Sequence, residues 1–185
     1  MFVGLAGYAR SGKDEAATAL VARGFKRIAL ADSLRQILYI TNPVVPMHGT
    51  INPYAPTWVI PLRELVDDKG WDEAKANAEV RRLLQVLGTD ACRHIISDNV
   101  WVDTALGHLH PGENIVVTDV RFANEAQAIQ SKGGYVIKIE RPGVGPANNH
   151  ISESALDNAD FDKVIINDGT INQLHNKLLE FVETA

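Results

Sequence analysis

A glycine-rich loop near the start of the chain limits the fold more than any other feature of the sequence. It lies between the apolar run MFVGLAG and the segment KDEAATALVARG, whose apolar side chains recur at helical spacing. Gly7 and Gly12 are spaced G-x-x-x-x-G and Lys13 follows directly, which is the pattern of a phosphate-binding loop between a strand and a helix. In such a loop the backbone N–H groups and the helix dipole attract a phosphate, and the lysine reaches its oxygens. The alternative is a glycine-rich turn with a surface lysine.

Strands and helices alternate along the rest of the chain. Apolar runs predict further strands in the segments FKRIALAD, ENIVVTDV, YVIKIERPG and DKVIIND. Helical spacing predicts helices in SLRQILYIT, in residues 61–97, in VWVDTALGHL, in RFANEAQAIQSKGG and from residue 170 to the end. This alternation predicts one α/β domain over residues 1–185, a P-loop α/β/α sandwich of three layers with a parallel sheet in the middle.

Glycines interrupt the helical pattern of residues 61–97 near Gly70 and at Gly88. We expect polar residues to cap the helices that begin or restart in this part of the chain. The expected caps are Asp32 or Ser33, Asp72 and Asp90.

The segment from Asn42 to Pro61 differs in kind from its surroundings. It concentrates prolines among polar and aromatic residues, at positions 43, 46, 53, 56 and 61. Such a stretch predicts an irregular excursion from the fold, and loops of that length are usually functional or disordered.

Composition and charge exclude several classes of protein. A chain of 185 residues with 45% hydrophobic residues suffices for one core, and its net charge of -5 argues against a broad basic surface for nucleic acid. Because of this charge we expect no nucleic-acid partner. Because the sequence has no signal peptide and no apolar run that would span a bilayer, we expect a cytoplasmic protein without a membrane partner. The single cysteine, Cys92, has no CxxC partner, so a thiolate zinc site is excluded and core packing is its expected role.

Asp14 stands where a phosphate-binding loop usually carries Ser or Thr. A carboxylate there can hold magnesium, directly or through water. Without the metal it would repel nearby phosphates, so we expect Asp14 to make triphosphate binding more dependent on magnesium. The alternative role is a helix cap at the positive end of the helix dipole.

Asp119 and Arg121 follow one another at the end of the strand ENIVVTDV, the edge at which an open parallel sheet binds ligands. Two residues apart, they point to the same face and would place a carboxylate and a guanidinium beside a transferring phosphoryl group. Asp119 would hold a magnesium-bound water or orient the attacking group. The alternative is a helix cap followed by a surface arginine.

Other arginines and one histidine are further candidates. Arg35 lies just past the second expected strand, where a monophosphate acceptor would approach, and Arg141 ends a strand at the same edge of the sheet. Of the adjacent Arg81 and Arg82 at most one points into a cleft, because neighbours on a helix face about 100° apart. His150, in the polar loop NNHISESAL, is by base rate a surface residue rather than a catalyst.

In several segments the chain resembles the bacteriophage deoxynucleoside monophosphate kinases, relatives of the adenylate kinase-like P-loop kinases. The segments are SGKD, RRLLQVLGTD, VVTDVRFANEA, VIKIERPG, HISESAL and INDGTINQL, in that order from Ser11 to about Leu174. The resemblance implies transfer of the γ-phosphoryl group from ATP to a deoxynucleoside 5′-monophosphate with magnesium, for phage DNA precursor supply in the host cytoplasm. It also implies a mobile acceptor-binding insert at residues 42–72. There Tyr54, Trp58 and Trp71 either stack on the acceptor base or form the insert's own core.

The resemblance also implies roles for individual residues. The implied catalytic residues are Lys13, Asp119 and Arg121, and the implied metal ligands are Asp14 and Asp119. The residues implied at the ATP site are Gly7, Ala9, Arg10, Ser11, Gly12, Lys13, Asp14, Glu15, Arg141, Asn167 and Gly169. The residues implied at the acceptor site are Asp32, Arg35, Trp71, Arg82, Asp90, Arg121, His150 and Glu153.

Other functions share parts of this pattern. The segments GKD and DVR are also similar to animal-type phosphomevalonate kinase, and dephospho-coenzyme A kinase has a comparable sheet; these enzymes differ in the acceptor. Outside the kinases, the alternative is a nucleotide-binding regulator or an ATPase without an acceptor. The sequence leaves open whether the chain forms a homodimer.

Overall fold

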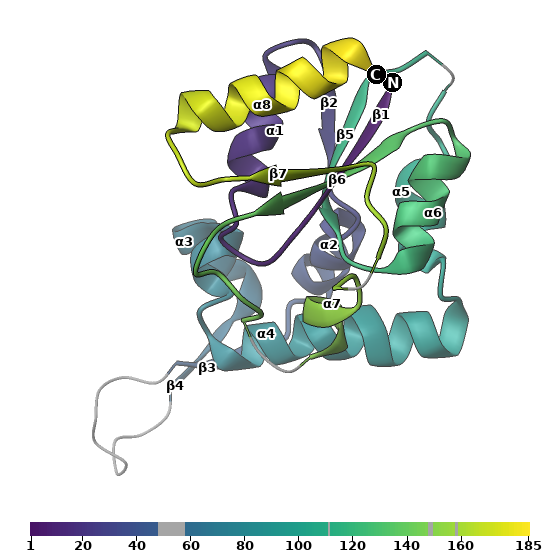
Figure 1. Cartoon of the computed structure of the whole chain (residues 1–185). Coiled ribbons are helices and arrows are strands. Elements are labelled where there is room, and N and C mark those ends of the chain that lie inside the picture. Colours follow the sequence, from purple (N-terminus) through teal and green to yellow (C-terminus); the bar gives the residue numbers. More distant parts are fainter. Residues whose placement is uncertain (48–57, 111, 148–149, 158) are drawn as a thin grey trace. The chain divides into compact units, whose positions relative to one another are not determined.

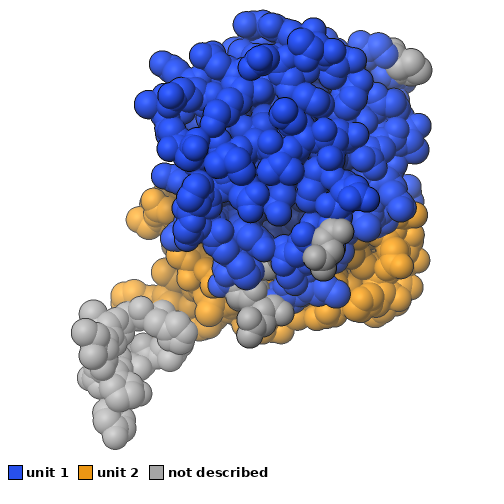
Figure 2. All heavy atoms as spheres, viewed as in Figure 1, with its two compact units in different colours: residues 1–30, 102–185 blue, residues 31–101 orange. Residues whose placement is uncertain are grey.

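The structure of the chain is a computed structural model that describes residues 1–47, 58–110, 112–147, 150–157 and 159–185. The chain is divided into two compact units. The first consists of residues 1–30 and 102–185, and the second of residues 31–101 (Figure 2). Each unit has a hydrophobic core of its own.

The first unit is built on a five-stranded parallel sheet. Its strands are ordered β2 (Lys26–Ile28), β5 (Ile115–Val120), β1 (Phe2–Ala6), β6 (Tyr135–Glu140) and β7 (Lys163–Ile166), and every neighbouring pair is parallel. The central strands are buried on both faces, which explains why they read as continuous apolar runs. The strands predicted from the sequence in this unit are confirmed.

Helices cover both faces of this sheet (Figure 1). On one face, α1 (Lys13–Val21) and α8 (Ile171–Thr184) share a core with the strands. On the other face lies α6 (Ala123–Ser131), whose Ile129 packs beside Gly4 of β1. The three-layer α/β/α sandwich with a parallel sheet is therefore confirmed.

The strand order places the loop after β1 at a reversal of the connectivity. From β1 the chain passes beyond β5 to reach β2, whereas β6 and β7 lie on the other side of β1. Ligands of open parallel sheets bind outside the carboxyl ends of the strands at such a reversal. The glycine-rich loop and the residues after β5 both start from this edge.

The second unit is mainly helical. It contains α2 (Asp32–Thr41), the antiparallel pair β3 (Val44–Met47) and β4 (Trp58–Pro61), α3 (Leu62–Ala74), α4 (Ala78–Gln85) and the π-helix η1 (Val86–Ile96). Its core is formed by Leu38, Val45, Leu62, Leu65, Ala74 and Val80. Cys92 is buried, as expected for core packing. The insert expected at residues 42–72 falls within this unit.

The proline-rich stretch is more regular than the sequence predicts. Residues 44–47 and 58–61 form the β3–β4 ribbon, in which Val45 pairs with Ile60 and Pro46 with Val59. β-Branched residues favour strands, and each strand of a two-stranded ribbon has an unpaired edge at which proline's missing N–H is tolerated. Residues 48–57, including Tyr54, lie outside the described residues.

The helix break predicted at Gly70 is confirmed, whereas the one predicted at Gly88 is wrong. Gly70 has φ 74° and ψ 166°, which interrupts α3. Gly88 lies inside η1, which continues α4. A β-carbon at Gly88 would lie 2.9 Å from Cδ2 of Leu34, and the Gly88 carbonyl accepts a hydrogen bond from Nε1 of Trp101 at 2.8 Å. Close packing, rather than a helix end, therefore explains this glycine.

Most of the expected caps are also wrong. The N-cap of α2 is Ala31, so that Asp32 and Ser33 lie inside the helix, and Asp90 lies inside η1. A capping residue needs a backbone outside the helix, and these helices begin earlier than their polar residues. Asn77 caps α4 by accepting hydrogen bonds from two backbone N–H groups, at 2.9 and 3.4 Å.

The segment expected to be a polar loop at residues 148–156 contains the short helix α7 (Ile151–Ser154). His150 is its N-cap, with Nδ1 accepting a hydrogen bond from the Ser152 N–H at 3.2 Å. The polar composition of the segment thus reflects a helix start rather than a loop throughout.

Candidate active site

The glycine-rich loop between β1 and α1 has the backbone that its motif requires. Gly7 and Gly12 have φ angles of 133° and 104°, which L side chains rarely adopt. A β-carbon at Gly7 would overlap the backbone carbonyl of Ile139, and one at Gly12 would lie 2.5 Å from Nδ2 of Asn167. Both glycines are therefore required by conformation and by space.

Lys13 begins α1 and is buried. Its ammonium donates hydrogen bonds to the carbonyl oxygens of Gly7 and Tyr8, each at 2.7 Å, so the side chain reaches back across the loop. Ser11 is buried, and its hydroxyl has no hydrogen-bond partner among the described residues. A cation and an unpartnered hydroxyl inside the loop are what a phosphate-binding site needs.

Asn167, which follows β7, supports the loop from the side. Its side-chain amide donates to the carbonyl oxygen of Ser11 at 2.8 Å, while its backbone N–H donates to the backbone carbonyl oxygen of Glu140 at 2.7 Å. The next residue, Asp168, accepts a hydrogen bond from the Lys177 ammonium at 2.9 Å, which holds the pKa of Asp168 below its usual value. The end of β7 is thereby fixed to the phosphate loop and to α8.

The two candidate metal ligands have different surroundings. The Asp14 side chain is 80% exposed in the first turn of α1, with one oxygen 3.6 Å from the Arg27 guanidinium. Asp119 is half-buried on β5, and its Oδ1 accepts a hydrogen bond from the Leu30 N–H at 2.7 Å. No group of three or more metal-ligating side chains occurs in the described part of the chain. A magnesium ion held by these carboxylates would therefore need phosphate oxygens as further ligands, which is its usual coordination.

Arg121 follows β5 in a turn that a buried carboxylate fixes. Glu125 accepts hydrogen bonds from the backbone N–H groups of Arg121 and Phe122, at 2.6 and 3.1 Å. These bonds involve the backbone of Arg121 alone, so its side chain extends from a rigid base. The sequence places Arg121 and Asp119 on one face, yet of the two only Arg121 lines the pocket beside the loop.

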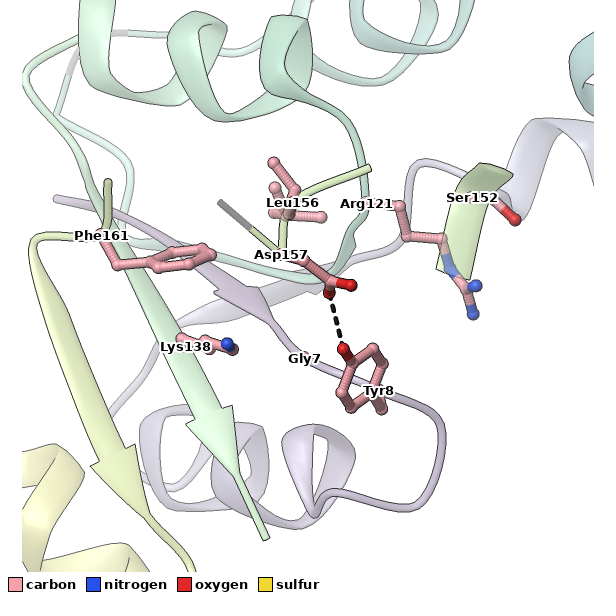
Figure 3. A pocket seen from close by; sticks show the side chains of 9 residues that line it. Gly7, Tyr8, Arg121, Lys138, Ser152, Leu156, Asp157 and Phe161 are labelled. Carbon is pink, nitrogen blue, oxygen red and sulfur yellow. Dashed lines mark hydrogen bonds between the residues drawn. The ribbon is translucent and has the colours of Figure 1, made fainter. Parts of the chain in front are cut away.

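That pocket lies between the phosphate loop, the end of β5, β6 and the segment after α7 (Figure 3). It measures about 30 Å³, space for one or two water molecules. The Tyr8 hydroxyl donates a hydrogen bond to Oδ1 of Asp157 across it, at 2.7 Å. Its lining residues are Gly7, Tyr8, Val120, Arg121, Lys138, Ser152, Leu156, Asp157 and Phe161.

Several lining residues escape the sequence analysis. Tyr8 occupies a variable position of the motif, while Asp157 and Phe161 lie in an irregular segment. Only Lys138 carries a usable signal, because it is a charged residue between two isoleucines in an otherwise apolar strand.

The remaining residues expected at the ATP site surround the loop or lie on its flanks. Arg10 is exposed and has a positive φ of 66°, and Glu15 contacts Nε2 of His175 on α8 through a carboxylate oxygen at 3.1 Å. Ala9 is half-buried in the loop, and Arg141 and Gly169 are exposed after β6 and β7.

In the second unit, the expected acceptor residues form local pairs. Arg35 pairs with Asp32 at 3.1 Å, and its buried Nε has no partner among the described residues. Arg82 binds Glu79 through two hydrogen bonds of 2.8 and 2.7 Å, which raise the pKa of Arg82 and lower that of Glu79.

The other acceptor candidates differ in exposure. Trp71 packs against the core of the second unit, as expected of a residue of the insert's own core, whereas Trp58 is 64% exposed. Asp90 is exposed on η1. In the first unit His150 caps α7, and the side chain of Glu153 lies outside the described part of the structure.

The chain is similar in sequence to one protein family and to several known proteins. Residues 64–178 match the family model described as deoxynucleotide monophosphate kinase. A protein of Acanthamoeba polyphaga mimivirus, provisionally named a deoxynucleotide monophosphate kinase, is 29% identical over 209 residues, which cover 100% of this chain and 97% of that protein. The deoxynucleotide monophosphate kinase of Escherichia phage RB69 is 35% identical over 104 residues, which cover 54% of this chain and 43% of that enzyme. Among solved structures, shikimate kinase from Aquifex aeolicus aligns with a TM-score of 0.48 and 11% identity over 99% of this chain and 96% of the other.

The parallel sheet and the glycine-rich loop with Lys13 define a P-loop phosphotransferase. The family match covers more than half of the chain. The chain therefore belongs to the deoxynucleotide monophosphate kinase family.

Proposed function

We propose that this chain transfers the γ-phosphoryl group of ATP to the 5′-phosphate of a deoxynucleoside monophosphate. The observation that carries the proposal is the phosphate loop. Lys13 folds across it, and the Ser11 hydroxyl inside it has no hydrogen-bond partner among the residues that the structure describes. This loop lies outside the range 64–178 that matches the family. Loop and family match therefore support the proposal independently.

The donor phosphates would bind in the loop. Its backbone N–H groups and the N-terminus of α1 supply partial positive charge, and the Lys13 ammonium would exchange its carbonyl partners for phosphate oxygens. Asn167 would hold the loop in shape through the Ser11 carbonyl. Arg141 and Gly169, at the ends of β6 and β7, are proposed to lie beside the donor nucleoside.

The residues present suit magnesium bound together with ATP. Asp14 is exposed at the start of α1, and Asp119 lies at the end of β5; a pair of carboxylates completed by phosphate oxygens is a common magnesium site. When bound, the ion would neutralise charge on the transferring phosphoryl group. We assign both carboxylates to holding it.

Catalysis would rest on positioning and charge neutralisation. An acceptor phosphate oxygen is already ionised near neutral pH, so the transfer needs no strong general base. Lys13 and Arg121 would neutralise the charge that develops on the phosphoryl oxygens. Asp119 would position the reacting groups rather than accept a proton.

The acceptor residues are proposed from both units. In the second unit, Arg35 has a buried Nε that finds no partner within the described part of the chain, and it follows the β2 segment closely in the sequence. Arg82, whose pKa is raised by Glu79, is a charged candidate for the acceptor phosphate. We propose that residues 42–72 form the acceptor-binding insert. The proposed acceptor residues also include Asp32, Trp71, Asp90, His150 and Glu153.

The biological setting is likewise proposed. The relatives named as deoxynucleotide monophosphate kinases include those of viruses and phages, which supports a role in supplying DNA precursors in the host cytoplasm. Within the described residues, no helix is long and apolar enough to cross a membrane. We propose nucleotides as the partners of this chain, neither nucleic acid nor membrane.

The reaction is tested by measuring ADP release from ATP and magnesium with each common deoxynucleoside and ribonucleoside monophosphate. Phosphomevalonate and a reaction without acceptor serve as controls, and Lys13→Met controls for contaminating kinases. We expect one or several deoxynucleotides to stimulate ADP release strongly. Release that no acceptor changes would overturn the proposal and favour a regulator or an acceptor-free ATPase.

A further inference from the structure

Lys138 lies immediately beside the phosphate loop. In the sheet it pairs with Ala6, the last residue of β1 before Gly7. Its neighbours Ile137 and Ile139 join the core on the α1 and α8 face, so by alternation Lys138 faces the opposite side. There it lines the pocket with Tyr8. Strand register therefore places a cation next to the start of the loop.

Among the described residues, the ammonium of Lys138 contacts an aromatic ring and forms no ion pair. Nζ lies 5.6 Å from the centre of the Phe161 ring, in a cation–π contact. Across the described ranges, no hydrogen bond or ion pair involves this ammonium, and the side chain is half-buried. By contrast, Lys177 on the surface pairs with Asp168. A partly desolvated cation that forms no ion pair favours an anion.

The rest of the pocket lining adds to this preference. Arg121 supplies a second cation, and Asp157 is the one carboxylate among the lining residues that the structure describes. One oxygen of Asp157 accepts the Tyr8 hydroxyl hydrogen bond. Figure 3 shows the Lys138 ammonium on one side of the Tyr8–Asp157 pair and the Arg121 guanidinium on the other. Positive charge therefore flanks the loop on the face away from α1.

We propose that Lys138 is a further phosphate-binding residue of the active site, which contacts phosphoryl oxygens of a bound nucleotide in the pocket shared with Arg121. The inference rests on the proposed function, because the nucleotides are its substrates. The phosphoryl oxygens belong either to the acceptor monophosphate or to the γ-phosphate of ATP. Lysine suits either source, since its ammonium binds phosphate as a point charge.

Chemical protection tests the contact without requiring turnover. The natural chain is treated with sulfosuccinimidyl acetate, and acetylation of each lysine is followed by mass spectrometry with ATP, with each common deoxynucleoside monophosphate, or with no ligand. We expect at least one nucleotide to slow acetylation of Lys138 about fivefold or more, the effect of an ammonium engaged by a phosphate. Lys163, exposed on β7, is the internal control and should react at an unchanged rate. If only ATP slows the acetylation of Lys138, the contact is to the donor. If only a monophosphate slows it, the contact is to the acceptor.

Kinetics of variants provide the second measurement. Lys138→Met should raise the KM of the nucleotide that it contacts roughly tenfold, as expected for loss of a charge-assisted hydrogen bond, while Lys138→Arg should retain most of the affinity. Lys163→Met is the matched control, and melting temperatures verify that all variants fold. Two results together would overturn the inference: both KM values of Lys138→Met lie within about twofold of those of the natural chain, and no nucleotide slows acetylation of Lys138 although ATP slows that of Lys13.

The inference and the proposed function can fail separately. If a nucleotide protects Lys138 but the natural chain phosphorylates no monophosphate, the subsite stands and the proposed reaction is wrong. If the chain is an active kinase in which Lys138 is neither protected nor needed, the reaction stands and the subsite is wrong.

Discussion

The side-chain amide of Asn167 donates a hydrogen bond to the backbone carbonyl of Ser11 at 2.8 Å, joining residues 156 positions apart in the sequence. The contact lies beside Gly12, whose missing side chain leaves room for the amide. The end of β7 therefore helps to shape the loop that would bind the donor phosphates.

We predict that Asn167→Ala weakens ATP binding roughly fivefold, the equivalent of one net hydrogen bond. Because the contact holds the loop and not a base, ATP, GTP and inorganic tripolyphosphate should be affected alike in calorimetric titrations. Asn176→Ala, at an exposed position of α8, is the control. A loss confined to ATP would instead indicate that Asn167 contacts the adenine.

Asp14→Ser should reduce the dependence of ATP binding on magnesium. In EDTA the variant should bind ATP about threefold more tightly than the natural chain, the factor expected for removing one charge about 6 Å from a phosphate in water. Titrations with and without magnesium measure the effect. The control is Asp103→Ser, at an exposed position that is distant from the loop in the sequence. Unchanged affinity in EDTA would leave interaction with the positive end of the α1 helix dipole as the role of Asp14.

Arg121→Ala should lower kcat on the order of 100-fold, as expected when one group that stabilises transition-state charge is lost. The affinity for ATP should change by no more than about twofold. The turn after β5 should persist, because the hydrogen bond from the backbone N–H of Arg121 to Glu125 remains in the variant. Arg23→Ala, at an exposed arginine paired with Glu183, provides the matched control. Equal losses in kcat and ATP affinity would contradict a role in the transition state.

Trp58 and Trp71, two of the three tryptophans of the second unit, should behave differently. Trp71→Ala should lower the free energy of unfolding by about 2 kcal/mol, because a half-buried aromatic side chain leaves the core. Trp58→Ala should change the free energy of unfolding by less than about 0.5 kcal/mol, since that side chain is exposed. Urea titrations measure both. If Trp58 stacks on the acceptor base, its variant should also raise the acceptor KM roughly tenfold.

The pair Asp168–Lys177 predicts a pH dependence. The hydrogen bond from Lys177 holds the pKa of Asp168 below its usual value, so the pair stabilises the folded chain above the unfolded pKa of the carboxyl group. This contribution is lost as the pH falls through the lowered pKa of the folded state. Lys177→Met should raise the pKa of Asp168 toward its usual value, as measured by NMR titration of the carboxyl carbon. An unchanged pKa would show that the pair does not form in solution.

The sequence predicted helices, strands and the phosphate loop correctly wherever a local pattern of residues determines their structure. The apolar runs predicted every strand of the parallel sheet, and Gly7, Gly12 and Lys13 predicted the loop, because backbone conformation and strand burial depend on neighbouring residues. Local patterns failed at Gly88 and in the β3–β4 ribbon. At Gly88, close packing against Leu34 decides the structure. In the ribbon, the pairing of β3 with β4 decides it.

The sequence by itself determined the class of fold, the phosphate loop and the residues nearest to it, since these are written in contiguous motifs. Only the tertiary structure brought Asn167 to Ser11, Asp157 to Tyr8 and Lys138 to the rim of the loop. These contacts join segments that are distant in sequence, and they arise from strand order and register in the sheet. No local spacing encodes them, because the partners meet only after the parallel strands have assembled.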